Sequence, residues 1–227
     1  MDQYHIYAQI SKGREGRYIL YIYIYSQFYS CNNTVTSYKA RKKKSIGYVT
    51  ARSYEKRLLS RVRNAVLLIN DMVHPNVVKF HNWYETRNHI WVVEEYCVGG
   101  NLRTVRSQDA YEPETSVRRF GVDLMAGLRY VHGRGIIHCD LKPSRILVNE
   151  YGVLKLTGFD IARRVTETKG RNQRGSTPHY MAPELIREKN DPPYSYKSDL
   201  WALGCILYEM YFGEPPFVAG TISDLNK

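Results

Sequence analysis

HCDLKPSRIL, at residues 138–147, is the stretch that decides the fold of this chain. Three more short motifs follow it in order: GFD at 158–160, APE at 182–184 and DLWALG at 199–204. Any one of them could arise by chance, whereas four in a fixed order and spacing do not. We therefore interpret them as parts of one domain.

The composition bounds the class of protein. The chain has 227 residues, 43% of them hydrophobic, which is enough for a sizeable core in one domain or in two lobes. Its four cysteines lie far apart without a C-x-x-C pair, and its seven histidines form no ligand cluster, so neither a disulfide framework nor a zinc site is expected. The N-terminus does not resemble a signal peptide, and no apolar run approaches the ~20 residues of a membrane span. We therefore expect a cytoplasmic protein without a membrane partner.

Positive charge gathers in one short segment. The net charge is +11, and part of it lies in KARKKK at residues 39–44. Such a cluster attracts nucleic acid, an anionic membrane or an acidic protein tail. A solvated loop is the plainer interpretation, and it is the one we adopt.

Hydrophobic periodicity predicts three elements. Residues 84–96 have a hairpin pattern, in which apolar stretches flank the polar turn ETRN at 85–88. A helix is expected to open at Pro113 and to close near Gly133, because apolar residues recur between them at three- and four-residue steps. Residues 199–211 are apolar nearly all round, which predicts a helix buried on every side.

The four motifs resemble, in order and spacing, the signature set of protein kinases, and GSTPHY at 175–180 is similar to the Ser/Thr type. Residues 81–91 and 97–102 resemble those of the fourth unc-51-like kinase and its Fused-like relatives. The resemblance implies an α+β, bilobal fold. Residues 1–96 would form an N-lobe with a small antiparallel sheet and one helix, and residues 97–227 a mainly helical C-lobe that is incomplete at its C-terminus.

The segment 17–33 departs from this pattern. It separates Gly13 and Gly16, which stand at the second and third places of a G-x-G-x-x-G loop, from the next kinase-like strand. A translated intron and a functional insertion both explain it. Its β-branched and aromatic run at 18–25 is expected to form a strand or to aggregate.

The resemblance also assigns roles to single residues. Asp140 matches the catalytic base, and Lys142 matches the lysine that steadies the γ-phosphate of ATP. That Asp140 merely orders its loop is the alternative. The nucleotide-binding positions are Gly13, Gly16, Arg52, Glu95, Cys97 and Leu147, with Arg52 in the place of the usual strand lysine.

Five positions carry residues that kinase chemistry does not use. Gly158 and Arg145 stand where the two magnesium ligands are expected; glycine offers no ligand, and a guanidinium opposes a divalent cation. Asp160 falls two residues late and could bind the metal only if the backbone shifts. Ala65 takes the place of the glutamate that pairs with the strand lysine, and Cys139 that of the arginine that binds a phosphorylated loop.

The resemblance implies a hinge between the lobes at Glu95 to Cys97, and Glu94 stands just before it, at a position that is usually apolar in kinases. A buried carboxylate without a partner would be costly there, so we expect Arg52 to neutralise it. If the register is off by one residue, Glu94 is exposed instead.

Three hypotheses follow for the function. The first is a pseudokinase that binds ATP weakly or without magnesium and acts as scaffold or regulator of a protein partner. The second is an active, atypical Ser/Thr kinase that phosphorylates protein with Asp140 as base and Asp160 recruited to magnesium. The third is an electrostatic binder of nucleic acid or microtubules through Lys39 to Lys44, although nucleic acid is the less favoured partner. The family resemblance adds microtubule or ciliary association and a cytoplasmic, partly cytoskeletal location as expectations.

Overall fold

The computed structural model describes residues 4–12, 35–42, 46–106, 113–167, 178–187 and 194–218, the first of these ranges by its backbone alone. The chain divides into two compact units: Met1–Val73 with Val78–Val98, and His74–Val77 with Gly99–Lys227. Gly13, Gly16 and the predicted insertion at 17–33 lie outside the described residues.

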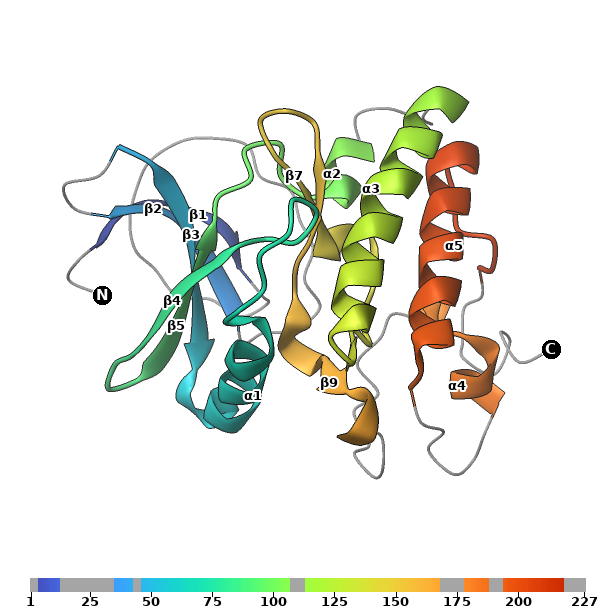
Figure 1. Cartoon of the computed structure of the whole chain (residues 1–227). Helices are drawn as coiled ribbons and strands as arrows, with labels where there is room; N and C mark the ends of the chain where they lie inside the picture. The colour runs from blue at the N-terminus through green and yellow to red at the C-terminus, as the bar shows by residue number, and fades with distance from the viewer. Residues whose placement is uncertain are drawn as a thin grey trace. The chain divides into compact units, whose positions relative to one another are not determined.

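The first unit is built on a five-stranded antiparallel sheet with strand order β1-β2-β3-β5-β4 (Figure 1). The strands are β1 Tyr4–Lys12, β2 Val35–Lys42, β3 Tyr48–Glu55, β4 Phe80–Glu85 and β5 His89–Glu95. The predicted hairpin is confirmed, because β4 and β5 pair with each other across a short polar turn and place Glu85 opposite Ile90.

One α-helix accompanies this sheet. The 3-10 turn η1, Lys56–Leu58, leads into α1, Leu59–Ile69. The buried residues of α1 are Val62, Ala65, Val66 and Ile69. They recur at three- and four-residue steps, so one stripe of the helix faces the core while Arg63 stays exposed. The predicted antiparallel sheet with one helix is confirmed.

The basic segment at 39–44 corrects one expectation, since its described part, residues 39–42, belongs to β2 and not to a loop. Lys39 pairs with Thr50 across the sheet, and its ammonium lies 4.1 Å from the ring centroid of Tyr48 and 4.9 Å from that of Tyr96. Aromatic faces attract a cation in this position. The interpretation of the segment as a solvated loop is therefore wrong for these residues.

The second unit is mainly helical (Figure 1). Its helices are α2 Leu102–Arg106, α3 Glu114–Gly133, α4 Pro183–Arg187 and α5 Tyr196–Phe212. Two small antiparallel ladders pair β6 Ile136–Ile137 with β9 Arg163–Arg164, and β7 Ile146–Val148 with β8 Leu154–Leu156. Single 3-10 turns are η2 Pro143–Arg145, η3 Phe159–Ile161, η4 Val165–Glu167 and η5 Pro178–Tyr180. The predicted α+β class is confirmed.

Helix α3 is the one predicted from Pro113 to Gly133. Pro113 is its N-cap, and the helix packs against β8 and α5. Its buried apolar residues include Leu124, Leu128 and Val131. Gly127 allows a close approach of α3 to the loop His74–Val77, because a β-carbon there would lie 2.6 Å from the carbonyl oxygen of Asn76.

Helix α5 corrects a second expectation. One face is buried, with Ile206 and Met210 at 0% and 1% exposure, and packs against α3 and η5. Other faces are open: Trp201 is 37% exposed, Tyr208 42% and Phe212 58%. The predicted burial on every side is therefore wrong, because these packing partners cover only part of the helix. Apolar as α5 is, no helix in the described part of the chain has both the length and the hydropathy to cross a membrane.

Candidate functional site

A single carboxylate holds the loop that joins β6 to η2 in the second unit. Asp199, in the first turn of α5, accepts the backbone N–H groups of His138 at 2.8 Å and of Cys139 at 3.0 Å. Its Oδ2 also lies 2.8 Å from Nε2 of His132. Asp199 is 2% exposed, so these bonds are shielded from water. Asp199 is therefore the acceptor that fixes the backbone of this loop.

His138 ties the loop to the segment that carries Gly158. Its Nδ1 accepts the N–H of Asp140 at 3.3 Å, and its Nε2 lies 3.0 Å from the carbonyl oxygen of Thr157. Complete burial lowers the pKa of the imidazole, so the ring is neutral and donates from Nε2. Its centroid is 4.8 Å from that of the Phe159 ring.

Cys139 has a left-handed backbone, with φ +66°, which costs a residue with a side chain roughly 1–2 kcal/mol. Its side chain belongs to a buried apolar cluster with Ile137 and Ile161, against which Tyr194 and Tyr196 pack. Burial raises the pKa of the thiol, which therefore stays protonated and neutral. This position offers no cation to a phosphorylated loop.

Asp140 faces two cations and is 3% exposed. Nζ of Lys142 lies 2.9 Å from Oδ1, and Nε of Arg145 lies 3.2 Å from Oδ2. The Arg145 contact is a charge-assisted hydrogen bond, one of the stronger kinds in proteins, whereas the Lys142 contact is an ion pair in which Oδ1 accepts no hydrogen bond within the described part of the chain. Each carboxylate oxygen therefore has a cation beside it, Oδ1 from Lys142 and Oδ2 from Arg145 of η2.

Arg145 joins Asp140 to Asp160. Its Nη1 lies 2.7 Å from Oδ2 of Asp160, while its Nε is directed to Asp140. A planar guanidinium can do this because its five N–H donors point in several directions. The side chains of Arg145 and Asp160 are 18% and 15% exposed, so the bridge is largely withdrawn from water. We call Asp140, Lys142, Arg145 and Asp160 the Arg145 cluster; it holds two positive and two negative charges.

The backbone of Gly158 lies against the side chain of the same arginine. Its φ is +82°, and a β-carbon on it would lie 2.3 Å from Cδ and 2.4 Å from Nη1 of Arg145. These separations are far inside van der Waals contact, so a side chain at 158 and this placement of Arg145 exclude each other. The lack of a side chain at 158 is what gives Arg145 room to reach Asp160.

The first unit carries a separate ion pair. Arg52 of β3 lies opposite Val92 of β5, which makes Glu94 its diagonal neighbour on the same face of the sheet. Nε of Arg52 lies 3.1 Å from Oε2 of Glu94, and the side chains are 11% and 8% exposed. The predicted pair is confirmed, and the alternative of an exposed Glu94 is wrong. Ala65 of α1 is buried and offers no carboxylate.

The remaining nucleotide positions with a description lie in both units. Glu95 ends β5, and its Oε2 accepts the N–H of Lys79 at 3.1 Å. Cys97 is buried in the first unit, and Leu147 lies in β7 of the second unit. Their contact with a nucleotide stays a prediction.

Comparison with known proteins now identifies the family. The family model named protein kinase domain matches residues 25–227. The chain belongs to the protein kinase family. The serine/threonine-protein kinase RUNKEL of Arabidopsis thaliana is 44% identical over 230 residues, 100% of this chain and 15% of that protein. The serine/threonine-protein kinase ULK4 of Mus musculus is 41% identical over 83% of this chain and 16% of its own length. The inactive serine/threonine-protein kinase PLK5 of Mus musculus is 37% identical over 75% of this chain and 28% of its own length.

This kinase-family chain thus spans about one-sixth of the length of the first two relatives. The predicted resemblance to Ser/Thr protein kinases and to the fourth unc-51-like kinase is confirmed by these matches.

In the kinase family, positions 158 and 145 are those at which the magnesium ligands are expected. The residues present do not fit a magnesium ion. Position 158 has no ligand oxygen, and a guanidinium already lies between the carboxylates of Asp140 and Asp160. Like charges repel, so a dication would have to displace Arg145. Recruitment of Asp160 to a metal would require its 2.7 Å contact with Arg145 to break.

Sequence reasoning missed the partners of Arg145. It treated the guanidinium as a charge that repels a metal, whereas the structure satisfies it with Asp140 and Asp160. A signal was present in the sequence, because a missing side chain at 158 accompanies a long cationic one at 145. A position without a side chain leaves volume that a long side chain in contact with it can fill.

The first prediction concerns the contact between Gly158 and Arg145. Gly158→Ala should lower the free energy of unfolding by about 3 kcal/mol, through left-handed strain and the clash with Arg145. Gly152→Ala is the matched control, because φ is +72° there and an added β-carbon meets nothing within 4 Å. It should cost about 1 kcal/mol. Urea denaturation of both variants measures the difference.

Adding Arg145→Ala to Gly158→Ala should recover about 1 kcal/mol or more relative to additivity, since the clash is then gone. Equal losses at the two glycines, or strict additivity in the double variant, would show that Arg145 does not pack against residue 158.

The second prediction concerns the buried pair in the sheet. Arg52→Met should cost about 3 kcal/mol, because it deprives Glu94 of its cation, while Arg52→Met with Glu94→Leu should stay within about 1 kcal/mol of the wild type. Lys56→Met, in the more exposed pair with Glu85, should cost less than about 1 kcal/mol. Chemical denaturation measures the free energy of unfolding of each variant. A double variant as unstable as Arg52→Met alone would show that the unpaired Glu94 is not the cause of the loss.

Proposed function

We propose that this kinase-fold domain is a pseudokinase, which binds a protein partner as scaffold or regulator and does not transfer phosphate through magnesium. The proposal rests on one observation: the guanidinium of Arg145 contacts the carboxylates of both Asp140 and Asp160. It engages the carboxylate that a kinase would use as base and the one that would have to serve as substitute metal ligand. The printed name of one relative, inactive kinase PLK5, supports the same direction.

The lost metal contacts have a large expected effect on rate. Removing ~3 kcal/mol of transition-state stabilisation at each of two contacts slows transfer by roughly four orders of magnitude, since ~1.4 kcal/mol is tenfold. A turnover near ~10 per second, ordinary for kinases, becomes roughly one per quarter hour. The scaffold does not depend on these contacts, because Asp199 holds the loop through backbone bonds.

Weak, metal-independent ATP binding is part of the proposal. The family resemblance places Arg52 and Lys142 near the phosphates, and in this domain both have carboxylate partners. A triphosphate therefore competes with Glu94 and Asp140 for the two cations, which reduces the affinity gained from each. A cytoplasmic location with a protein partner completes the proposal; a microtubule or ciliary partner rests on family resemblance alone.

An active kinase is the second candidate, and one observation favours it. Asp140 and Lys142 are both retained and lie 2.9 Å apart, as a base and its neighbouring cation would. This mechanism would need Arg145 to leave both carboxylates when substrate binds.

The third prediction compares ATP binding with magnesium and with a chelator. In the wild type, ATP should raise the midpoint of thermal unfolding equally in both conditions, because the metal lacks its two ligands. Arg145→Asn with Gly158→Asp returns an oxygen ligand at each position and removes the guanidinium, so a magnesium-dependent rise should appear. The measurement is a thermal-shift titration of the two proteins.

Radiolabel transfer to a generic basic protein provides the control, with Asp140→Asn as the reference for background. Wild type and Asp140→Asn should incorporate phosphate at the same low rate. A wild-type rate well above that reference, together with a clear gain from magnesium, would replace the pseudokinase by the active kinase.

A further inference from the structure

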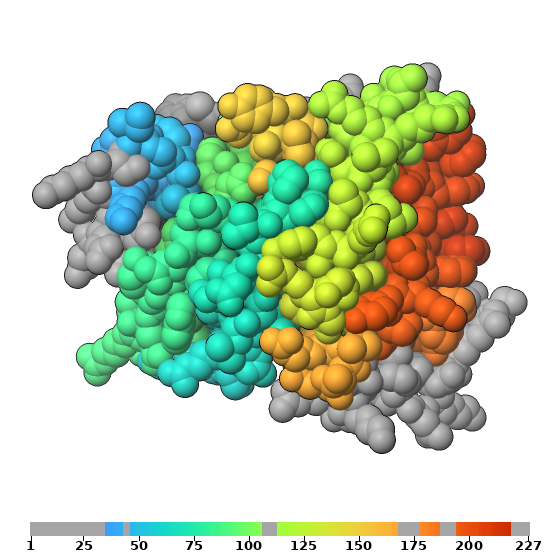
Figure 2. Space-filling model, viewed as in Figure 1, coloured from blue at the N-terminus to red at the C-terminus, as the bar shows by residue number. Residues whose placement is uncertain are grey.

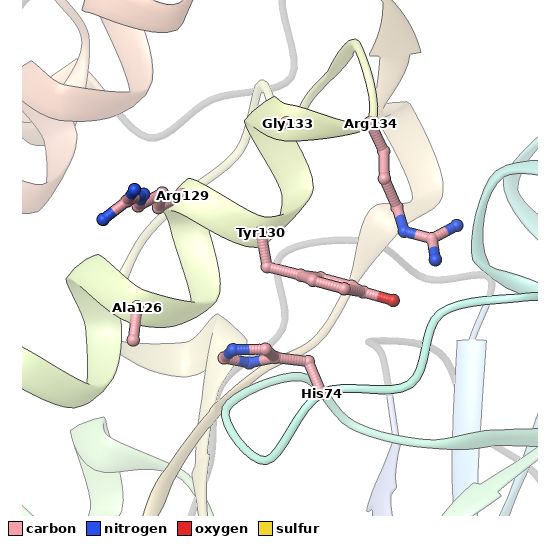
Figure 3. Close-up of a pocket in the computed structure, with 6 residues that line it drawn as sticks. All are labelled: His74, Ala126, Arg129, Tyr130, Gly133 and Arg134. Carbon is pink, nitrogen blue, oxygen red and sulfur yellow. The ribbon is translucent and has the colours of Figure 1, made fainter.

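A hollow between the C-terminal half of α3 and His74, in the second unit, contains no residue of the Arg145 cluster. Its volume is about 500 Å³ (Figure 3). The lining residues are His74, Ala126, Arg129, Tyr130, Gly133 and Arg134. All but the first belong to α3 or to its C-cap. We call it the Tyr130 hollow.

One wall of the hollow is aromatic. The rings of His74 and Tyr130 are stacked, with centroids 4.7 Å apart and planes at 26°. The guanidinium carbon of Arg134 lies 4.8 Å from the Tyr130 centroid. Burial, with a smaller effect from the charge of Lys155, lowers the pKa of His74, so its ring is neutral near pH 7. The wall is therefore uncharged, with a cation at its edge.

The loop that supplies His74 is firmly held. Nδ2 of Asn76 donates to the carbonyl oxygen of Leu154 at 3.1 Å, and the carbonyl oxygen of Asn76 accepts the N–H of Leu156 at 2.9 Å. On its other side the same loop touches Gly127 of α3. A hollow with fixed walls binds at a lower ordering cost than one that must be assembled.

The rim of the hollow is cationic. Arg129 and Arg134 are exposed and lie on either side of Tyr130 (Figure 3), and within the described ranges no carboxylate forms an ion pair with either. The acidic side chains of α3 are engaged elsewhere: Glu114 pairs with Arg118, and Asp123 accepts a backbone N–H from β8. The C-terminus of α3 contributes roughly half a negative charge, less than the two arginines supply.

An exposed apolar strip leads along α3 to this rim. Val122 and Met125 are 70% and 48% exposed, and they precede Arg129 by seven and four residues, on the same face of the helix. Figure 2 shows part of the surface of α3 uncovered in the second unit. The surface thus offers apolar contacts first, then a hollow with aromatic walls, then two cations.

We propose that the Tyr130 hollow and the strip of Val122 and Met125 form a docking site for an acidic segment of a partner protein. An aromatic or aliphatic side chain of that segment enters the hollow beside Tyr130. Carboxylates that flank it bond the guanidinium groups of Arg129 and Arg134, and a further apolar residue covers the strip. Aromatic and charged anchors of this kind carry most of the binding energy in protein interfaces.

Charge complementarity favours this occupant over other polyanions. A nucleic acid backbone needs cations along its path, and a membrane surface needs a broad basic face. The hollow instead sets two arginines around an apolar cavity and extends into an apolar strip. That combination matches a peptide with alternating carboxylate and apolar side chains.

A fluorescein-labelled random copolymer of glutamate and tyrosine, followed by anisotropy, tests the proposal. Salt near ~0.15 M shortens the screening length to roughly 8 Å, which limits the effect of the general positive charge. Arg129→Glu with Arg134→Glu should weaken binding by about tenfold or more, because it reverses both rim charges. Ala126→Phe should also weaken binding without any change of charge, because it fills the hollow.

The matched control is Lys42→Glu with Arg87→Glu, two exposed cations of the first unit, which changes the net charge by the same amount. Its effect should stay below about twofold. Circular dichroism melting curves show that each variant is folded. Equal losses in the two double variants, an unchanged affinity in Ala126→Phe, or no preference for the copolymer over polyglutamate would overturn the proposal. A single-stranded oligonucleotide or phosphatidylserine vesicles that lose affinity by the same factor would show a general anion site instead.

Discussion

The contact of Arg145 with two carboxylates is the constraint on which the second unit's polar site depends. Arg145 stands at a sequence position where a kinase is expected to have a magnesium ligand, and its guanidinium bonds Asp140 on one side and Asp160 on the other. The positive charge of this side chain thereby neutralises part of the charge of both carboxylates. Arg145 fills the space that a side chain at position 158 would need. Glycine at this position also provides no side-chain ligand for an ion.

This domain retains one set of interactions typical of kinases and lacks another. The set that holds the loop uses backbone N–H groups and the buried carboxylate of Asp199, and it is complete. The set that would hold magnesium and align phosphates depends on side chains at 145, 158, 52 and 65, and each of these differs from what phosphoryl transfer needs. Since the first set does not depend on the second, a stable fold can persist without the chemistry. In the first unit, Arg52 is likewise engaged within the protein, because it forms an ion pair with Glu94 of the neighbouring strand.

The sequence predicted the elements whose pattern is local. Periodicity located the hairpin of β4 and β5 and the span of α3, and motif spacing located the loop that Asp199 anchors. It failed where neighbours far along the chain decide. The basic run at 39–42 is drawn into β2 by pairing with β3 and by the rings beside Lys39, and α5 is covered on part of its circumference only. The missing metal ligands were visible at 145 and 158, but the bond from Arg145 to Asp160 was not, because it depends on where a flexible side chain turns.

The central claim is that an internal guanidinium replaces a metal ion between Asp140 and Asp160. Crystals of the domain grown with excess manganese, examined in an anomalous difference map, test it most directly, because manganese prefers the same oxygen ligands as magnesium and is visible in such a map. The account predicts that Arg145 lies between the two carboxylates and that no anomalous peak appears at coordination distance, roughly 2.1 Å, from either of them. A peak bound to Asp160 or Asp140, with Arg145 turned away, would contradict it.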